Sequence, residues 1–364
     1  MESTPLLSTL GFAGLLAVLA PAQSQATLTI FADRDNTIWN QSPTCCSNGA
    51  GTHLFVGTNG IPIPMRTLVH FDIAGSLPQG ATIVAAELSV NCLRTRSAGN
   101  SVDLHRLTAD WGEGGSFASG GGGGQGGGAS SIGDDANWFA RFFSQGLNWT
   151  SPGGDFDANA TSNVTIFGVG SYLFATSPSM VADVQGWLDT PSTNFGWILI
   201  GDEPPGSSTS KQLASRENGA NGPRVRVTFT APDAMWGTFG NPCDTMASPA
   251  PSLGVDPAVG TGQPTIGQSM RLQVTQGATA MSATAIFLGG SQATPPITLP
   301  APYSCDQNVQ PLLWGGATDM SLGLTLAIPN NVVLAGLELY WQAFGAANPF
   351  RLVATNGVMT RLGL

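Results

Sequence analysis

The chain has 364 residues, enough for two or three domains, and hydrophobic residues make up 42% of it while charged residues make up only 10%. Together with 48 glycines and 25 prolines, this composition is typical of a turn-rich all-β protein and excludes a largely helical or disordered one. The net charge is −10, and Lys211 is the only lysine among the 13 basic residues. No basic patch is therefore available for phosphate contacts, and nucleic-acid binding is not expected.

The N-terminus has the pattern of a secretory signal peptide. Leu6 begins a short apolar run, and Ala20-Pro21-Ala22 follows it as a small-residue cleavage site, so residues 1–22 are predicted to be the signal. The first five residues carry no Lys or Arg, and the alternative is an apolar strand or helix of the mature fold. No later run reaches the ~18 apolar residues of a membrane span. We expect a soluble mature chain that is secreted or held at the cell surface and is not membrane-spanning.

The next part of the chain consists of short apolar segments separated by turn signals. Strands are predicted at residues 27–32, 53–57, 67–73, 82–92 and 101–107. This rhythm is typical of a β-sandwich or jelly roll. From residue 108 to 154 the pattern is lost. The glycine run at 120–128 lacks the lysine of a phosphate loop, so it is predicted to be a flexible insertion.

One helix and two strands are predicted further on. Met180, Val184 and Trp187 lie at helical spacing, and Ser177 provides an N-cap. Residues 197–200 are apolar without alternation, which is typical of a strand buried on both faces. Residues 224–229 alternate between apolar and polar, as expected of a half-exposed strand that closes the domain.

Seven blocks occur in a fixed order over residues 27–230: ADRDNTIW, RTLVHFDIAGSLPQGATIVAAELSV, VDLHRLTADWGEG, WTSPGGDFD, DVQGWLDTPSTNFGWILIG, KQLASRE and PRVRVTF. This series resembles the DNRLRE-type domain, also classed as carbohydrate-binding module family 96. The resemblance implies a jelly-roll β-sandwich on secreted or surface proteins, often beside polysaccharide-degrading catalytic domains. The Cys45-Cys46 pair and the glycine run depart from the family pattern.

A second unit is expected after a boundary rich in Pro, Gly, Ser and Thr. Residues 231–267 are predicted to be a linker or domain edge, and residues 268–364 a second, smaller all-β domain. Met270, Leu272 and Val274 alternate with polar residues at its start. Its segments AIPNNVVLAGLELYWQAF and TNGVMTRLGL resemble a C-terminal domain found on many secreted bacterial proteins.

Five cysteines fit an oxidising compartment and leave one unpaired. Cys243 and Cys305 both lie in the C-terminal region and are predicted to form a structural disulfide. Cys92 shares a predicted strand face with Val84 and other apolar residues, and two interpretations stay open: a buried thiol, or a disulfide to Cys45 or Cys46. No Cys or His spacing typical of zinc is present.

Several tryptophans lie in polar loops, where an indole ring either anchors the loop to the core or faces a ligand. Anchoring is favoured because long loops need a fixed point. The second interpretation makes these residues a platform for sugar rings; its candidates are Trp39, Trp111, Trp138 and Trp149. Trp187 and Trp197 are assigned to the core instead, because they belong to the predicted helix and the buried strand.

Carboxylates in the same region are candidates for three roles: forming turns, carrying solvated surface charge, or holding a structural calcium ion. Asp155 and Asp157 alternate in a Gly-Gly-Asp-Phe-Asp segment, and their oxygen atoms would suit calcium. A catalytic acid and base pair is not expected, although a polysaccharide lyase or hydrolase is the enzymatic alternative. The sequence therefore predicts a secreted, non-catalytic protein that binds a polysaccharide or cell-surface glycan through loop tryptophans. The alternative is a structural or adhesion component without a small ligand.

Overall fold

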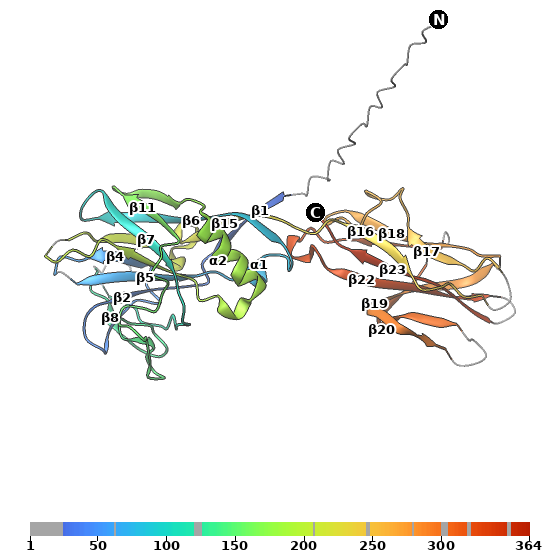
Figure 1. Cartoon of the computed structure of the whole chain (residues 1–364), viewed down its shortest axis with the longest axis horizontal. Helices are drawn as coiled ribbons and strands as arrows, with labels where there is room; N and C mark the ends of the chain where they lie inside the picture. Colours follow the sequence, from blue (N-terminus) through green and yellow to red (C-terminus); the bar gives the residue numbers. More distant parts are fainter. Residues whose placement is uncertain are drawn as a thin grey trace, which may run out of the picture.

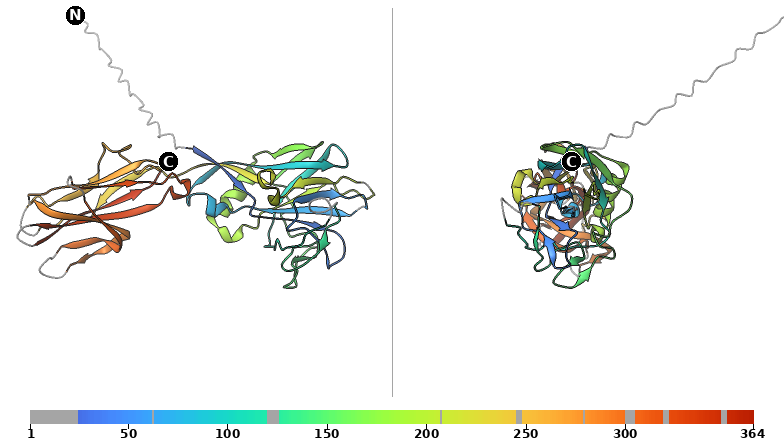
Figure 2. Two further views of the ribbon diagram at one scale, coloured as in Figure 1. Left: turned by 180° about the vertical axis from the view of Figure 1, so that it is seen from behind. Right: turned by 90° about the vertical axis from the view of Figure 1, so that its left-hand side faces the viewer.

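The structure is a computed structural model that describes residues 25–61, 63–119, 126–206, 208–244, 248–278, 280–299, 305–318, 322–347 and 351–364. The signal peptide predicted at residues 1–22 lies outside this range. Two β-rich units stand end to end along the long axis of the molecule (Figures 1 and 2). In the described part of the chain, every helix is too short or too polar to cross a membrane.

Antiparallel strands build the first unit, and their bounds are β1 (Gln25–Phe31), β2 (Arg34–Trp39), β4 (His53–Thr58), β5 (Pro64–His70), β6 (Thr82–Thr95), β7 (Asn100–Arg106), β11 (Ser162–Ile166), β12 (Gly170–Phe174), β13 (Trp197–Gly201), β14 (Lys211–Ala214) and β15 (Arg224–Thr230). Their hydrogen-bonded order is β1-β15-β6-β14-β4-β5-β13-β7-β11, with β12 beside β6 and β2 beside β5. Four short strands lie in the long loops: β3 (Cys45–Ser47), β8 (Ala129–Ser130), β9 (Ala140–Phe142) and β10 (Leu147–Asn148).

The main core of this unit lies between two groups of strands, β1-β15-β6-β14-β4 and β2-β5-β13-β7-β11. Fully buried side chains from both groups meet in it, among them Leu88 and Val227 from the first and Val69 and Leu104 from the second. Burial of apolar faces from both sides is the arrangement of a sandwich. The all-β prediction is confirmed. The finer jelly-roll assignment stays a prediction.

The helix predicted from periodicity is α2 (Pro178–Asp189), where the Ser177 hydroxyl accepts a hydrogen bond from the backbone N–H of Met180 at 3.0 Å. Its apolar face covers one end of the core through Val184 and Trp187. The Trp187 ring contacts Trp197 of β13, with 4.6 Å between ring centroids. Both tryptophans are thus core residues, as predicted. The other helical segments are short: α1 (Ile73–Ser76), η1 (Pro191–Thr193) and η2 (Arg216–Asn221).

Strand β13 is buried on both faces because a second apolar cluster covers its outer side. Trp197 and Leu199 point into the main core, whereas Ile198 belongs to the outer cluster. That cluster joins outward-facing strand residues to loop residues and comprises Ile38, Leu68, Leu107, Trp111, Ala136, Trp138, Trp149 and Ile198. Residues 197–200 are apolar on both faces of the strand because the folded loop packs over the outer face of this sheet.

One face assignment in β6 is wrong. The alternation predicts that Val84 shares the buried face of Cys92, but Val84 is 45% exposed and Ile83 is buried instead. The pairing of β6 with β15 shifts register between Thr228 and Phe229, which pair with Ala85 and Ile83. A bulge of this kind adds one residue to one strand and reverses the faces beyond it.

The second unit contains β16 (Met235–Phe239), β17 (Ser252–Val255), β18 (Ser269–Thr275), β19 (Met281–Thr298), β20 (Asp306–Ala317), β21 (Gly323–Ala327), η3 (Val332–Leu334), β22 (Glu338–Ala347) and β23 (Arg351–Arg361). The strands form sheets of order β16-β23-β22-β19-β20 and β17-β18-β21 around a separate core. Strands β16 and β17 fall within residues 231–267. Because β16 pairs with β23 and β17 pairs with β18, these strands are part of the second unit and not of a free linker.

The two units touch through the turn that follows η3. Ala335 is 3% exposed and belongs to the core of the first unit, and Leu364 packs against that core. A Cβ atom at Gly336 would come within 3.3 Å of the backbone oxygen of Gln79. The C-terminus accordingly lies at the junction in both side views (Figures 1 and 2).

The predicted disulfide between Cys243 and Cys305 is present, with 5.5 Å between the Cα atoms. A second disulfide joins the neighbouring residues Cys45 and Cys46. Cys92 is a buried free thiol, so its suggested bond to Cys45 or Cys46 is wrong. The reason is positional: Cys92 faces the main core from β6, whereas Cys46 packs in a separate cluster.

Candidate functional site

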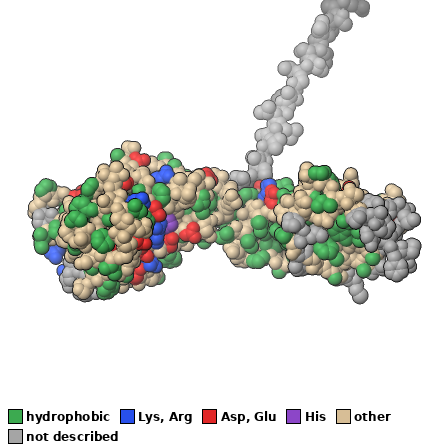
Figure 3. Space-filling model, turned by 90° about the horizontal axis from the view of Figure 1, so that it is seen from below, with side chains coloured by type: hydrophobic (Ala, Val, Ile, Leu, Met, Phe, Trp, Pro, Cys, Tyr) green, Lys and Arg blue, Asp and Glu red, His purple; other side chains and the backbone are tan. Residues whose placement is uncertain are grey.

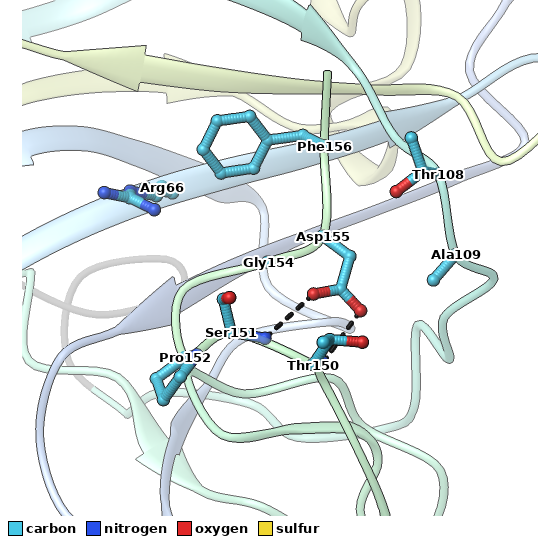
Figure 4. Close-up of a pocket in the computed structure, with 9 residues that line it drawn as sticks. All are labelled: Arg66, Thr108, Ala109, Thr150, Ser151, Pro152, Gly154, Asp155 and Phe156. Carbon is cyan, nitrogen blue, oxygen red and sulfur yellow. Dashed lines mark hydrogen bonds between the residues drawn. The ribbon is translucent and has the colours of Figure 1, made fainter. Parts of the chain in front are cut away.

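A cleft of about 540 Å³ opens where the loops after β7 and β10 meet β5. Figure 4 shows its lining side chains, with Arg66 and Phe156 on one side, Thr108 and Ala109 on the other and Asp155 between them. The full lining is Arg66, Thr108, Ala109, Thr150, Ser151, Pro152, Gly154, Asp155 and Phe156. Hydroxyl groups, one carboxylate and one aromatic ring thus converge on a single hollow.

Arg66 lies at one end of the cleft, where it is paired with Glu203. Its Nε and Nη2 atoms donate hydrogen bonds to the two carboxylate oxygens of Glu203, both at 2.9 Å, and Nη1 donates to the backbone oxygen of Gly153 at 2.9 Å. The rings of Trp138 and Phe156 lie near the guanidinium, with centroids 4.6 and 5.6 Å from its central carbon. A bidentate pair stacked on aromatic rings fixes the side chain in one position.

Two glycines allow the loop to lie close to this arginine. Gly153 and Gly154 have φ values of +97° and +109°, which side chains of L-residues rarely tolerate. A Cβ atom on Gly153 would come 2.7 Å from Nη1 of Arg66 and 2.9 Å from the Trp138 ring. The Gly-Gly-Asp-Phe segment is therefore shaped to bring Asp155 and Phe156 to the cleft.

Asp155 stabilises the loop at residues 150–155 by accepting hydrogen bonds from its backbone. Its two carboxylate oxygens accept hydrogen bonds from the backbone N–H groups of Thr150 and Ser151, both at 2.9 Å (Figure 4). Asp157 instead accepts from the backbone N–H of Asn159 at 3.0 Å. The two carboxylates thus stabilise different turns, one before Asp155 and one after Asp157. The described residues contain no cluster of three Asp, Glu, His or Cys side chains that could hold a metal ion, and the calcium site stays a prediction.

The four tryptophans predicted to bind sugar are buried, so the indole platform is wrong. Trp39 and Trp111 are 0% exposed, Trp138 is 6% exposed and Trp149 is 5% exposed. Three of the indole N–H groups donate hydrogen bonds of 2.8–3.0 Å to backbone oxygens: Trp39 to Gly126, Trp111 to Phe195 and Trp149 to Asn137. A ring enclosed in this way cannot present its face to a ligand. These side chains anchor the loops, which was the favoured interpretation.

The Cys45-Cys46 pair packs against the described end of the glycine run, and Trp39 contacts both. Trp39 donates to the backbone oxygen of Gly126, and a Cβ atom on Gly128 would come 2.5 Å from the Cβ of Cys46 and 3.0 Å from the Trp39 ring. Strand β3, which contains both cysteines, pairs with β8 directly after the glycines. A side chain does not fit at Gly128, whose φ is +67°, so this glycine has a packing role. Residues 120–125, where flexibility was predicted, lie outside the described part.

Charged side chains gather on one face of the first unit, whereas the same view of the second unit shows mainly uncharged side chains (Figure 3). Several charged residues of the quoted sequence blocks meet in a network. Arg34 pairs with Asp110 at 3.3 Å, and Arg216 donates to both oxygens of Glu113 at 2.6 and 2.9 Å. The network joins β2, the loop after β7 and η2, so these block residues have a structural role in this chain.

Asp35 lies at the centre of the network and is completely buried. Its Oδ2 atom accepts from the backbone N–H of Arg216 at 2.6 Å, while Oδ1 has no hydrogen-bond partner. Burial raises the pKa of the Asp35 carboxyl well above its ordinary value, and the nearby Glu217 and Glu113 raise it further. Burial also raises the pKa of Glu113. Because a ligand cannot reach Asp35, we assign this network to stability.

No family model matches the chain, and no curated protein matches it. The likeness to the DNRLRE-type domain therefore rests on the sequence blocks alone. Sequence reasoning missed Arg66 and Phe156. Two features of the sequence could have indicated them: Arg66 is a charged residue within an otherwise largely apolar strand, and Gly153 and Gly154 precede Asp155 and Phe156.

Proposed function

We propose that the protein is a secreted or surface-held glycan-binding protein whose site is the cleft at Asp155 and Phe156. The observation that carries the proposal is the set of groups at this cleft. Thr108, Thr150 and Ser151 are exposed and offer hydroxyls, while the Phe156 ring is half-buried and offers an apolar edge or face. Sugars combine hydroxyl edges with apolar ring faces, and such a mixed lining matches both.

The cleft supports binding better than catalysis. Asp155 supplies the only carboxylate among the nine described residues of the lining, and its two oxygens already accept backbone hydrogen bonds. Glycoside hydrolysis requires a second positioned carboxyl group. The Cys243–Cys305 disulfide supports an extracytoplasmic location, where such bonds persist.

An array of immobilised neutral and acidic polysaccharides tests the proposal on the full chain. We expect saturable binding to at least one polysaccharide without release of reducing sugar during incubation. Absence of binding across the array would reject glycan binding and favour a purely structural component. Release of sugar would reassign the cleft to an enzyme.

A further inference from the structure

We infer that the cleft selects neutral glycans over uronate-containing, anionic ones. This inference rests on the proposed function and names the ligand class of the same site. The charge around the cleft carries it. Arg66 is the only cationic side chain among the described lining residues, and Asp155 is the only anionic one. The preference between neutral and anionic glycans depends on how far other protein groups already neutralise the charges of Arg66 and Asp155.

The positive charge of Arg66 is compensated by protein groups. Glu203 binds it through two parallel hydrogen bonds of 2.9 Å, and the side chains of Arg66 and Glu203 are 16% and 18% exposed. A third hydrogen bond goes to Gly153, and the neighbouring Trp138 and Phe156 rings limit access to the guanidinium. A sugar carboxylate would have to displace Glu203 or share the guanidinium with it.

The negative charge of Asp155 has no cationic partner among the described residues. Its oxygens accept only backbone N–H groups, which stabilise the charge without cancelling it. The residual charge of the cleft is therefore negative, on a chain whose net charge is already −10. An approaching polyuronate is repelled both at long range and within the cleft.

The remaining groups suit an uncharged sugar. Three exposed hydroxyl-bearing residues, Thr108, Thr150 and Ser151, can each donate and accept hydrogen bonds, as sugar hydroxyls do. Pro152 and Phe156 add apolar surface beside them. A carboxylate oxygen of Asp155 has further lone pairs with which to accept from a sugar hydroxyl. A sugar hydroxyl that donates a hydrogen bond is therefore favourable beside Asp155, whereas a sugar carboxylate is not.

Calorimetric titration of the full chain with neutral xylo-, manno- and gluco-hexaoses and with hexagalacturonate tests the inference. We expect at least one neutral hexaose to bind about tenfold or more tightly than hexagalacturonate, with little dependence on salt. Asp155→Asn should reduce this ratio about threefold or more, since it removes the repelling charge. Asp157→Asn is the matched control and should leave the ratio unchanged, because Asp157 does not line the cleft.

The outcomes separate the two proposals. Hexagalacturonate binding as tightly as the best neutral hexaose, or more tightly, would overturn the neutral preference and leave glycan binding intact. An unchanged ratio in Asp155→Asn would also overturn it. Absence of binding to every hexaose would count against glycan binding itself. Melting temperatures of both variants must stay near that of the parent, which distinguishes a change of selectivity from a change of fold.

Discussion

Arg66 of β5 and Glu203, which follows β13, are joined by two hydrogen bonds of 2.9 Å, so the end of the cleft is electrically neutral. The pair is mostly buried, and Glu203→Gln would leave the guanidinium without its counter-charge. We expect a loss of about 1.5–3 kcal/mol in the free energy of unfolding, the cost of a charge-assisted hydrogen bond. Chemical denaturation measures it. Glu87→Gln removes the partner of Arg226, which is 59% exposed, and should cost under about 1 kcal/mol. Equal losses in both variants would contradict a special role for the Arg66 pair.

Trp111 should be a stability residue. It is fully buried in the outer cluster and donates from Nε1 to the backbone oxygen of Phe195 at 2.9 Å. Trp111→Ala should lower the free energy of unfolding by about 3–5 kcal/mol, because it removes a large buried ring and leaves a cavity. Phe117→Ala, at a side chain that is 55% exposed, should change it by under about 0.5 kcal/mol. A Trp111→Ala variant of parental stability would refute the anchoring role.

The Cys243–Cys305 disulfide should stabilise the second unit. It connects residues 62 positions apart, and the chain-entropy account assigns about 4 kcal/mol to a loop of that length. The double variant Cys243→Ala, Cys305→Ala should therefore unfold at lower denaturant concentration in its C-terminal half. Tryptophan fluorescence and proteolysis can follow the two units separately. Peptide mapping that found both thiols free in the parent would contradict the assignment.

Asp35 should make stability depend on pH. Its pKa is raised in the folded state from a reference value of 3.8, so the unfolded chain loses the proton at lower pH than the folded one. The stability that protonation provides is full below pH 3.8 and is lost as the pH rises through the folded pKa, by about 1.4 kcal/mol per pKa unit.

Removal of the charge tests this sign. Asp35→Asn should flatten the decline of unfolding free energy with rising pH, measured by denaturation from acid to neutral pH. Asp110→Asn, at a side chain that is 47% exposed, should preserve the slope of the parent. A steeper decline in Asp35→Asn than in the parent would show that the Asp35 carboxylate is stabilised by the fold.

The local pattern of the sequence was sufficient for α2, β13 and β15, because helical spacing, uniform burial and alternation each report how a segment meets the core. It was not sufficient for the face of Val84, since the bulge is a property of the pairing with β15 and not of β6 alone. The tryptophans were ambiguous for a similar reason. An indole in a polar loop has the same sequence signal whether it packs on Ile198 or faces solvent. The cleft could not be predicted, because Arg66, Thr108 and Asp155 meet only after three distant segments have folded together.

Blocking the cleft tests the central claim most directly. Thr108→Tyr fills the hollow from an exposed position, and Thr165→Tyr places the same side chain at an exposed site on β11, which pairs with the opposite end of β7. Titrated with the best neutral hexaose, Thr108→Tyr should bind about tenfold or more weakly than the parent, whereas Thr165→Tyr should bind equally well. Unaltered binding by Thr108→Tyr, with its fold intact, would contradict the assignment of this cleft as the glycan site.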